Sequence, residues 1–61
     1  MGIKWVTDGD NHFAYVAGVN TGYWIKATDG TARLHAGNKP LETFSQLAHA
    51  KEAAETEICR S

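Results

Sequence analysis

Residues 8–12, DGDNH, form the densest group of potential metal ligands in the chain. Closely spaced carboxylate and amide oxygens suit a calcium loop, which needs a glycine at position 6 and a bidentate glutamate at position 12. Counted from Asp8, these two positions are occupied by Phe13 and Val19. The spacing therefore predicts a hairpin turn at this point, and no calcium site.

The other reactive side chains are too scattered to form a catalytic set. His12, His35 and His49 have no metal-ligand spacing. Ser45 and His49 are one helical turn apart, but no acid follows to orient the histidine, and Ser45 is better explained as a helix cap. A single cysteine, Cys59, can form neither an intramolecular disulfide nor a zinc site by itself. We expect no enzymatic activity, no metal and no cofactor.

Composition points to one small globular domain, residues 1–61. The chain is 43% hydrophobic and 21% charged, which is too apolar for a disordered protein. A chain of this size buries only about 60% of its unfolded surface, so a deep catalytic pocket would consume much of its core. Its net charge of −1 excludes neither nucleic acid nor protein as a partner. With no signal-peptide pattern and no apolar run long enough to cross a bilayer, we expect a cytoplasmic protein.

Turn-forming residues interrupt the first two-thirds of the chain at 8–11, 18–22, 29–30 and 36–40. The β-prone runs between them predict strands at about 3–7, 12–17, 23–28 and 32–36, and possibly a short strand at 41–44. Asp29-Gly30 best fits a type I′ hairpin, because both of its central residues need a positive φ. Pro40 has no N–H to donate, so the last run is either an edge strand or the approach to a helix.

The C-terminal third predicts one amphipathic helix over about 45–59. Ser45 is the expected N-cap, and Thr43 with Gln46 offers a capping box as an alternative. The apolar stripe of the helix is thin: Leu47, Ala50, Ala54 and Ile58. Small side chains allow close approach to a sheet, so the bulky half of the core must come from the strands. The fold class is therefore α+β, an antiparallel meander of three to five strands packed against one helix.

Side chains alternate along a strand, so each strand contributes to two faces. One register collects a bulky set for the face under the helix: Ile3, Trp5, Phe13, Tyr15, Tyr23, Ile25, Leu34 and Leu41. The opposite face then collects a basic and partly aromatic set that contains no acid: Lys4, Val6, His12, Ala14, Val16, Trp24, Lys26, Arg33 and His35. A slip of one residue would exchange the two faces.

Two interpretations of the second face stay open. In the first it is a contact surface, where Trp24 stacks on a base or fills a partner's pocket, and the cations meet phosphates or carboxylates. In the second, Trp24 packs over Val16 and Ala14, and the cations only keep the sheet soluble. An acidic helix face is a further candidate surface. The candidate binding residues are Lys4, Trp24, Lys26, Arg33, His35, Glu52 and Glu55.

The stretch from Tyr23 to Glu55 resembles a pattern found in short bacterial and phage-encoded proteins. The pattern joins an aromatic strand, a turn, a second strand and a capped Ala-rich helix, here FSQLAHAKEAAE over 44–55. AP2-like and integrase N-terminal arm domains are similar in plan, which implies a sheet that contacts DNA with a helix behind it. In size and style the chain also resembles phage-encoded inhibitors of host defence, including anti-CRISPR proteins.

These observations lead to two hypotheses about function. The first is a non-catalytic protein-binding module, a phage or mobile-element product that blocks a host complex targeting nucleic acid. The second is a small nucleic-acid-binding domain that uses the basic and aromatic sheet face. A third possibility is a structural protein that assembles through an exposed edge strand.

Overall fold

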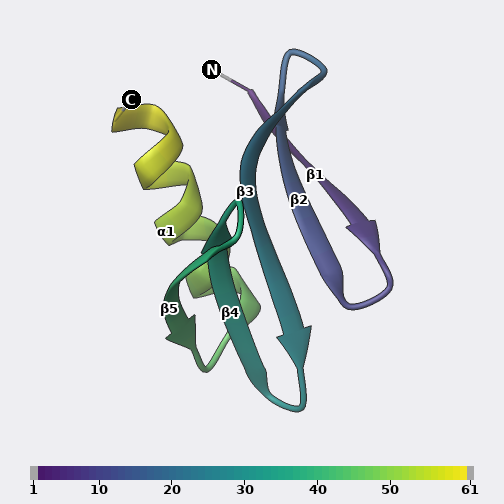
Figure 1. Ribbon diagram of the computed structural model, residues 1–61, viewed down its shortest axis with the longest axis vertical. Helices are drawn as coiled ribbons and strands as arrows, with labels where there is room; N and C mark the ends of the chain where they lie inside the picture. The colour runs from purple at the N-terminus through teal and green to yellow at the C-terminus, as the bar shows by residue number, and fades with distance from the viewer. Residues whose placement is uncertain (1, 61) are drawn as a thin grey trace.

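The computed structural model describes residues 2–60, which form one antiparallel sheet and one helix (Figure 1). The elements are β1 Ile3–Asp8, β2 Asn11–Val16, β3 Val19–Thr28, β4 Thr31–Ala36, β5 Lys39–Phe44 and α1 Leu47–Arg60. The five strands pair in sequence order, so the sheet is a simple meander with β1 and β5 at its edges. The helix lies behind the sheet in the view of Figure 1. This arrangement confirms the predicted α+β fold.

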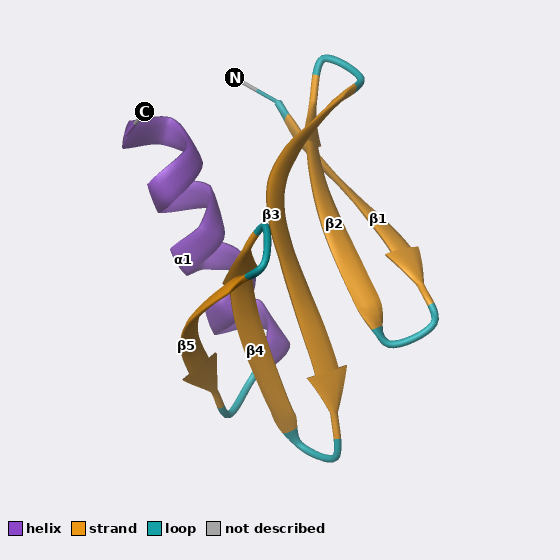
Figure 2. Cartoon of the chain, viewed as in Figure 1, coloured by secondary structure: helices purple, strands orange, loops and turns teal. Residues whose placement is uncertain are grey.

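Short turns connect all the strands (Figure 2). Asp29 and Gly30 have φ values of 44° and 77°, which confirms the predicted type I′ turn. The turn between β2 and β3 has the same form at Ala17 and Gly18, with φ values of 52° and 78°. Alanine is a poor residue for this position, because its Cβ clashes with the backbone in the left-handed region.

Strand β3 is longer than predicted, because residues 20–22 do not form a turn. The pairing shifts between Phe13 opposite Trp24 and Tyr15 opposite Asn20, so β3 carries extra residues in a bulge. Gly22, with φ 90°, supplies the backbone conformation that the bulge requires. The Thr21 hydroxyl donates to the Ala14 carbonyl oxygen at 2.9 Å and holds the bulge against β2. Residues that favour turns therefore serve here to bend a continuous strand.

Helix α1 begins at Leu47, two residues later than predicted. The Ala50 N–H donates to the Gln46 carbonyl oxygen at 3.3 Å, which closes the first turn. In the part of the chain that the structure describes, Ser45 makes no capping hydrogen bond, and Thr43 lies within β5. Both predicted caps are therefore wrong, although the predicted stripe is correct. Ala50, Ala54 and Ile58 are buried.

The core lies between α1 and the middle of the sheet. It consists of Ile25, Ala32, Leu34, Ala50 and Ala54, with Trp5, Tyr23, Phe44, Leu47 and Ala53 packed around it. Ile25 is the largest side chain that is completely buried. The alanines of the helix bring its backbone close to the strands, so a few large strand residues fill the space between them.

The predicted faces are correct for β1, β3 and β4, and wrong for β2. His12 lies opposite Ile25, and Ala14 lies opposite Trp5, so both point toward the helix. Phe13, predicted for the core, instead lies opposite Trp24 on the other face, and Tyr15 follows it by alternation. The small Ala14, which is fully buried, leaves room beneath the helix where a bulkier residue was expected.

Leu41 is also predicted for the core but remains 42% exposed. A second bulge separates the pair Leu34 and Glu42 from the pair His35 and Pro40, and Leu41 is the extra residue. Strand β5 does run along the sheet edge, as Pro40 requires.

One polar contact joins the edge strand β1 to the helix. The Trp5 indole Nε1 donates a hydrogen bond to Glu55 Oε2 at 3.0 Å. Lys51 Nζ lies 5.6 Å from the centre of the same indole ring, close enough for a cation–π interaction. Because the apolar stripe of the helix is narrow, its alanines do not reach β1. The contacts of Trp5 with Glu55 and Lys51 attach this strand to the helix instead.

We expect the substitution Ala17→Asn to raise the free energy of unfolding by about 0.5–1 kcal/mol, because asparagine tolerates positive φ. The reciprocal substitution Asp29→Ala should lower it by a similar amount. Urea unfolding followed by tryptophan fluorescence measures both. Equal stability of the two variants would contradict the assigned turn geometry.

We expect Trp5→Phe to lower the free energy of unfolding by about 1–2 kcal/mol, since it removes a hydrogen bond to a carboxylate and part of a half-buried ring. In a Glu55→Gln background the same substitution should cost less, because a neutral acceptor makes a weaker hydrogen bond. A double-mutant cycle by urea unfolding gives the coupling energy. Strict additivity would show that the contact does not stabilise the fold.

Candidate functional site: the open face of the sheet

The face of the sheet opposite the helix, which we call the open face, carries two ordered rows of side chains. Cross-strand pairing aligns the first row from β1 to β4 as Val6, Phe13, Trp24 and His35. The next row, from β1 to β5, is Asp8, Asn11, Lys26, Arg33 and Thr43. Directly opposed residues on neighbouring strands point to the same side, so each row forms a continuous strip across the sheet.

The aromatic row, Phe13, Trp24 and His35, is a packed cluster. The Trp24 and His35 rings are 4.1 Å apart between centroids and nearly parallel, at 8°. Phe13 approaches from the other neighbouring strand, at 6.2 Å and 28°. The Trp24 Nε1 donates to the Gly37 carbonyl oxygen at 2.8 Å, which orients the indole. The His35 Nδ1 is buried and has no hydrogen-bond partner within residues 2–60.

This packing limits what the aromatic row can bind. A planar base inserted between two rings needs about 7 Å, twice the usual contact distance of about 3.5 Å. Neither of the two measured separations, 4.1 Å and 6.2 Å, provides that space. The mutually facing ring surfaces are therefore closed to a base. Trp24 does form a second small cluster, but with Phe13 and His35 and not with Val16 and Ala14.

Beside the aromatic row lies the basic pair, Lys26 and Arg33. The two residues are directly opposed on β3 and β4, and both are exposed. Among the described residues neither forms an ion pair, and Arg33 Nε makes only a 3.4 Å hydrogen bond to the Thr43 hydroxyl. Directly opposed like charges cost stability. Stability of the sheet therefore gives no reason for this pair, whereas binding of an oxyanion would.

The pair borders a shallow hollow of about 370 Å³ on the open face. The hollow is lined by Trp24, Lys26, Thr28, Thr31, Arg33 and His35. The two cations and the Thr28 hydroxyl are donors that suit a carboxylate or a phosphate group, whereas the Thr31 hydroxyl already donates to the Thr28 carbonyl oxygen at 2.8 Å. Chemically, the arrangement can hold one compact anionic group beside an apolar ridge.

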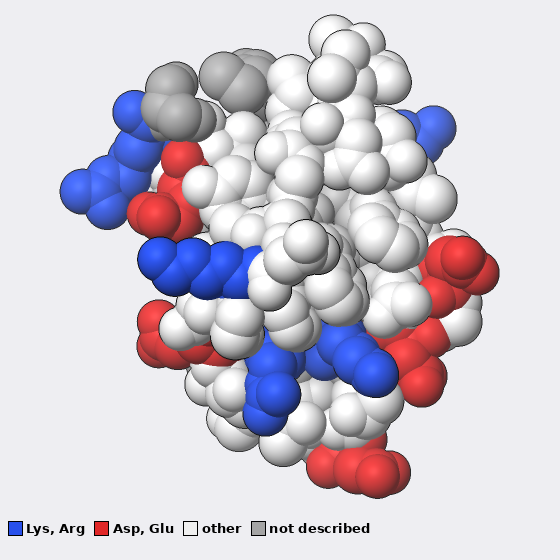
Figure 3. Space-filling model, in the orientation of Figure 1, with Lys and Arg blue, Asp and Glu red and all other residues white. Residues whose placement is uncertain are grey.

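Acidic side chains border the basic pair at the end of the sheet where β1 and β3 finish. Asp8 ends the row that contains Lys26, which corrects the expectation that this face has no acid. Asp10 and Asp29 occupy the turns after β1 and β3, at that same end of the sheet. In Figure 3, some basic side chains lie together in the lower half of this face, and acidic ones lie at its left, right-hand and lower margins. Charge therefore changes sign over a short distance, which does not suit a long polyanion.

The structure separates the remaining candidate residues from this group. Lys4 is exposed on the open face, but it lies opposite Tyr15 on the far side of the aromatic row. On the helix, Glu52 is exposed, whereas the Glu55 carboxylate accepts the hydrogen bond from Trp5. Four of the predicted residues thus come together: Trp24, Lys26, Arg33 and His35.

Three residues of the aromatic row and the hollow were not predicted on this face: Phe13, Thr28 and Thr31. The alternation of side chains along β2 is compatible with either register. The bulky set is predicted for the core because the narrow helix needs large side chains beneath it. The signal for the observed register is the small size of Ala14 and Ala32, which both lie under the helix. Thr28 ends the strand predicted at 23–28 and Thr31 follows the hairpin turn, and neither is assigned to a face from the sequence.

No group of three histidine, cysteine or acidic side chains within residues 2–60 is arranged to hold a metal ion. The one helix in that range lacks the length and apolarity needed to cross a membrane.

Comparison with known proteins gives no relative: the sequence matches no family model, no curated protein and no solved structure at a significant level.

His12, predicted on the open face, lies on the helix side with its Nδ1 3.1 Å from the Thr7 hydroxyl. Burial lowers its pKa from the ordinary 6.5, and the nearby Lys51 lowers it further, while Asp10 acts in the opposite direction. The unfolded chain thus binds this proton more readily than the folded one. The stabilising contribution is complete above pH 6.5 and is lost as the pH falls through the lowered value.

We therefore expect an NMR titration of the His12 ring to give a pKa below 6.5, and Lys51→Gln to raise it. The melting temperature of the parent protein should fall between about pH 7 and pH 5 more steeply than that of His12→Gln. A His12 pKa above 6.5 would show that the ring is solvated or paired with Asp10.

Proposed function

We propose that this chain is a non-catalytic binding module that docks the open face of its sheet on a partner protein. The observation that carries the proposal is the basic pair, Lys26 and Arg33, which forms no ion pair in the described chain and lies beside the packed aromatic row. Aromatic residues and arginine dominate the energetics of protein interfaces. In this proposal the aromatic row forms the centre of the contact, and the basic pair receives a carboxylate of the partner.

The dimensions of the molecule support a contact of ordinary size. A standard interface takes about 800 Å² from each partner, which is about a fifth of the 4047 Å² accessible surface of this chain. The two longer dimensions of the chain are 31 and 22 Å, and Figure 3 looks onto that broad side. One face of so small a protein is therefore enough for a specific complex.

Two features favour a protein over a nucleic acid as the partner. The ring faces of the aromatic row are already stacked on one another, so they offer little surface to a base. Asp8, Asp10 and Asp29 would repel a polyanion that continued past the basic pair, whereas a protein surface of mixed charge can pair with both signs. The expected inhibitor of a host nucleic-acid-targeting complex would be one such module, because occupying a surface needs no catalytic group.

We expect the double variant Lys26→Glu with Arg33→Glu to lose its partner by about tenfold or more in a quantitative capture from lysate of the source cells. The variant keeps two like charges opposite each other, so its stability should remain close to that of the parent protein. The matched control is Lys39→Glu with Arg60→Glu, which changes the net charge equally, outside the basic pair, and should retain the partner. Equal capture by both variants would exclude the open face.

Fluorescence anisotropy with labelled single- and double-stranded oligonucleotides separates the two partner classes. We expect no binding at about 0.2 M salt and only weak binding at low salt. The nucleic-acid hypothesis instead predicts a steep salt dependence, whose slope falls by about 1 for each of Lys26→Ala and Arg33→Ala. That result would replace the protein partner with a nucleic acid.

A further inference from the structure

A second surface, separate from the open face, lies between strand β5 and helix α1. A hollow of about 390 Å³ is lined there by Leu34, Leu41, Glu42, Ala53, Thr56 and Glu57. Its floor is apolar, because Leu34 is almost fully buried and Leu41 remains exposed above it. We call this surface the β5 groove.

The bulge in β5 gives the groove its exposed leucine. Leu41 has no directly opposed residue in β4, since the pairing passes from Leu34 with Glu42 to His35 with Pro40. Bulges redirect side chains and are common near sheet edges and functional sites. Here the bulge turns a large apolar side chain toward α1 without covering it, so stability alone does not account for its position.

Strand β5 is also an edge strand with an unpaired outer side. It pairs only with β4, and no other strand of the described chain lies beyond it. Backbone N–H and C=O groups on such an edge can pair with an extended segment of another protein. Pro40 cannot donate, so the usable edge runs from Leu41 to Phe44. The groove and the free edge are therefore adjacent, as β-strand addition requires.

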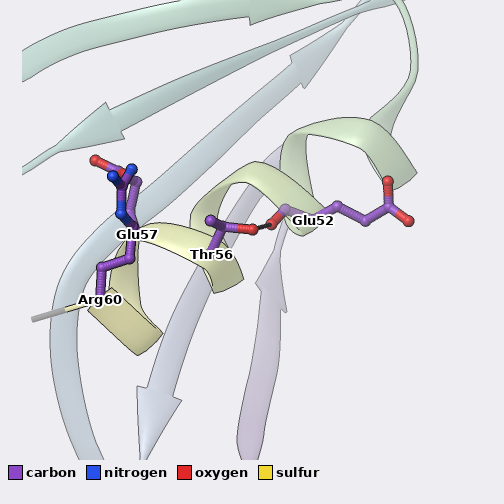
Figure 4. Close-up of polar contacts among 4 residues, drawn as sticks. All are labelled: Glu52, Thr56, Glu57 and Arg60. Carbon is purple, nitrogen blue, oxygen red and sulfur yellow. Dashed lines mark hydrogen bonds and ion pairs between the residues drawn. The ribbon is translucent and has the colours of Figure 1, made fainter.

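The rim of the groove is acidic. Glu42 is exposed on β5, and Glu57 lies across from it on the helix. The only cation paired here in the described chain is Arg60, whose Nη1 is 3.4 Å from Glu57 Oε2, and its side chain is 74% exposed. Figure 4 shows Glu57 and Arg60 together at the end of the helix, while the Glu52 carboxylate points away from them. An exposed pair of this kind is weak, so a partner's cation can replace Arg60.

We infer that the β5 groove receives an extended segment of a partner protein in which one apolar residue has a basic residue two positions before it and another two positions after it. Its backbone adds to β5, the apolar side chain packs on Leu41 and Ala53, and the two basic side chains meet Glu42 and Glu57. This spacing is required because every second side chain of a strand points to the same side, and here all three must face the groove. A second copy of the chain fits less well, since pairing β5 with itself brings both acidic rims together.

The test uses two synthetic heptapeptides, TKTVTKT and TETVTET, titrated into the isotope-labelled protein and followed by NMR. The basic peptide should shift the amide signals of Lys39–Phe44 most strongly, with saturable binding. Leu41→Ser and Glu42→Lys should each weaken that binding by about threefold or more. The matched controls, Val19→Ser at another exposed apolar residue and Glu52→Lys at a helix carboxylate that does not line the groove, should change it less than about twofold.

Several outcomes would overturn the inference. These are no saturable shift at millimolar TKTVTKT, equal binding of TETVTET, or equal effects of the groove variants and their controls. Sedimentation of the free protein provides a further check: a dimer that Leu41→Ser dissociates would make a second copy the occupant. The groove contains neither Lys26 nor Arg33. A negative result with the peptides therefore leaves the proposed function of the open face untouched, and a negative result at the open face leaves the groove untouched.

Discussion

The pairing of β2 with β3 determines which side chains this protein buries and which it presents. Setting Phe13 opposite Trp24 places His12 and Ala14 under the helix and completes an aromatic row on the other face. A shift of one residue would exchange these sets, because strand side chains alternate with a period of two. The bulge at Gly22 then allows β3 to bend while keeping this register through its central residues.

The narrow apolar stripe of the helix explains why two surfaces remain uncovered. Its alanines approach the sheet closely and cover Ile25 and Leu34, but this stripe is too narrow to cover all five strands. The Trp5–Glu55 hydrogen bond attaches the β1 side of the sheet, while on the β5 side Leu41 is left partly uncovered. On the open face, the aromatic row supplies packing that the helix cannot provide, and the basic pair lies beside it.

Local chemistry predicted the secondary structure well and the faces less well. Asp29-Gly30 specified its turn, and the alanine stripe specified the buried side of the helix. Asn20 to Gly22 suggested a turn because their side chains and backbone favour one, yet the same preferences suit a bulge. Ser45 could cap a helix, but the chain leaves β5 at Phe44 and needs two more residues before α1 begins.

The amino-acid sequence by itself determined the order of strands and helix, the hairpin at Asp29-Gly30 and the presence of Trp24, Lys26, Arg33 and His35 as chemically distinctive side chains. Periodicity and turn chemistry are local, so they can be read along the chain. Only the tertiary structure decided that Phe13 joins Trp24, that Asp8 borders the basic pair and that Leu41 stays exposed. These features depend on register and bulges, which the packing of β2, β3 and β5 against their neighbours selects.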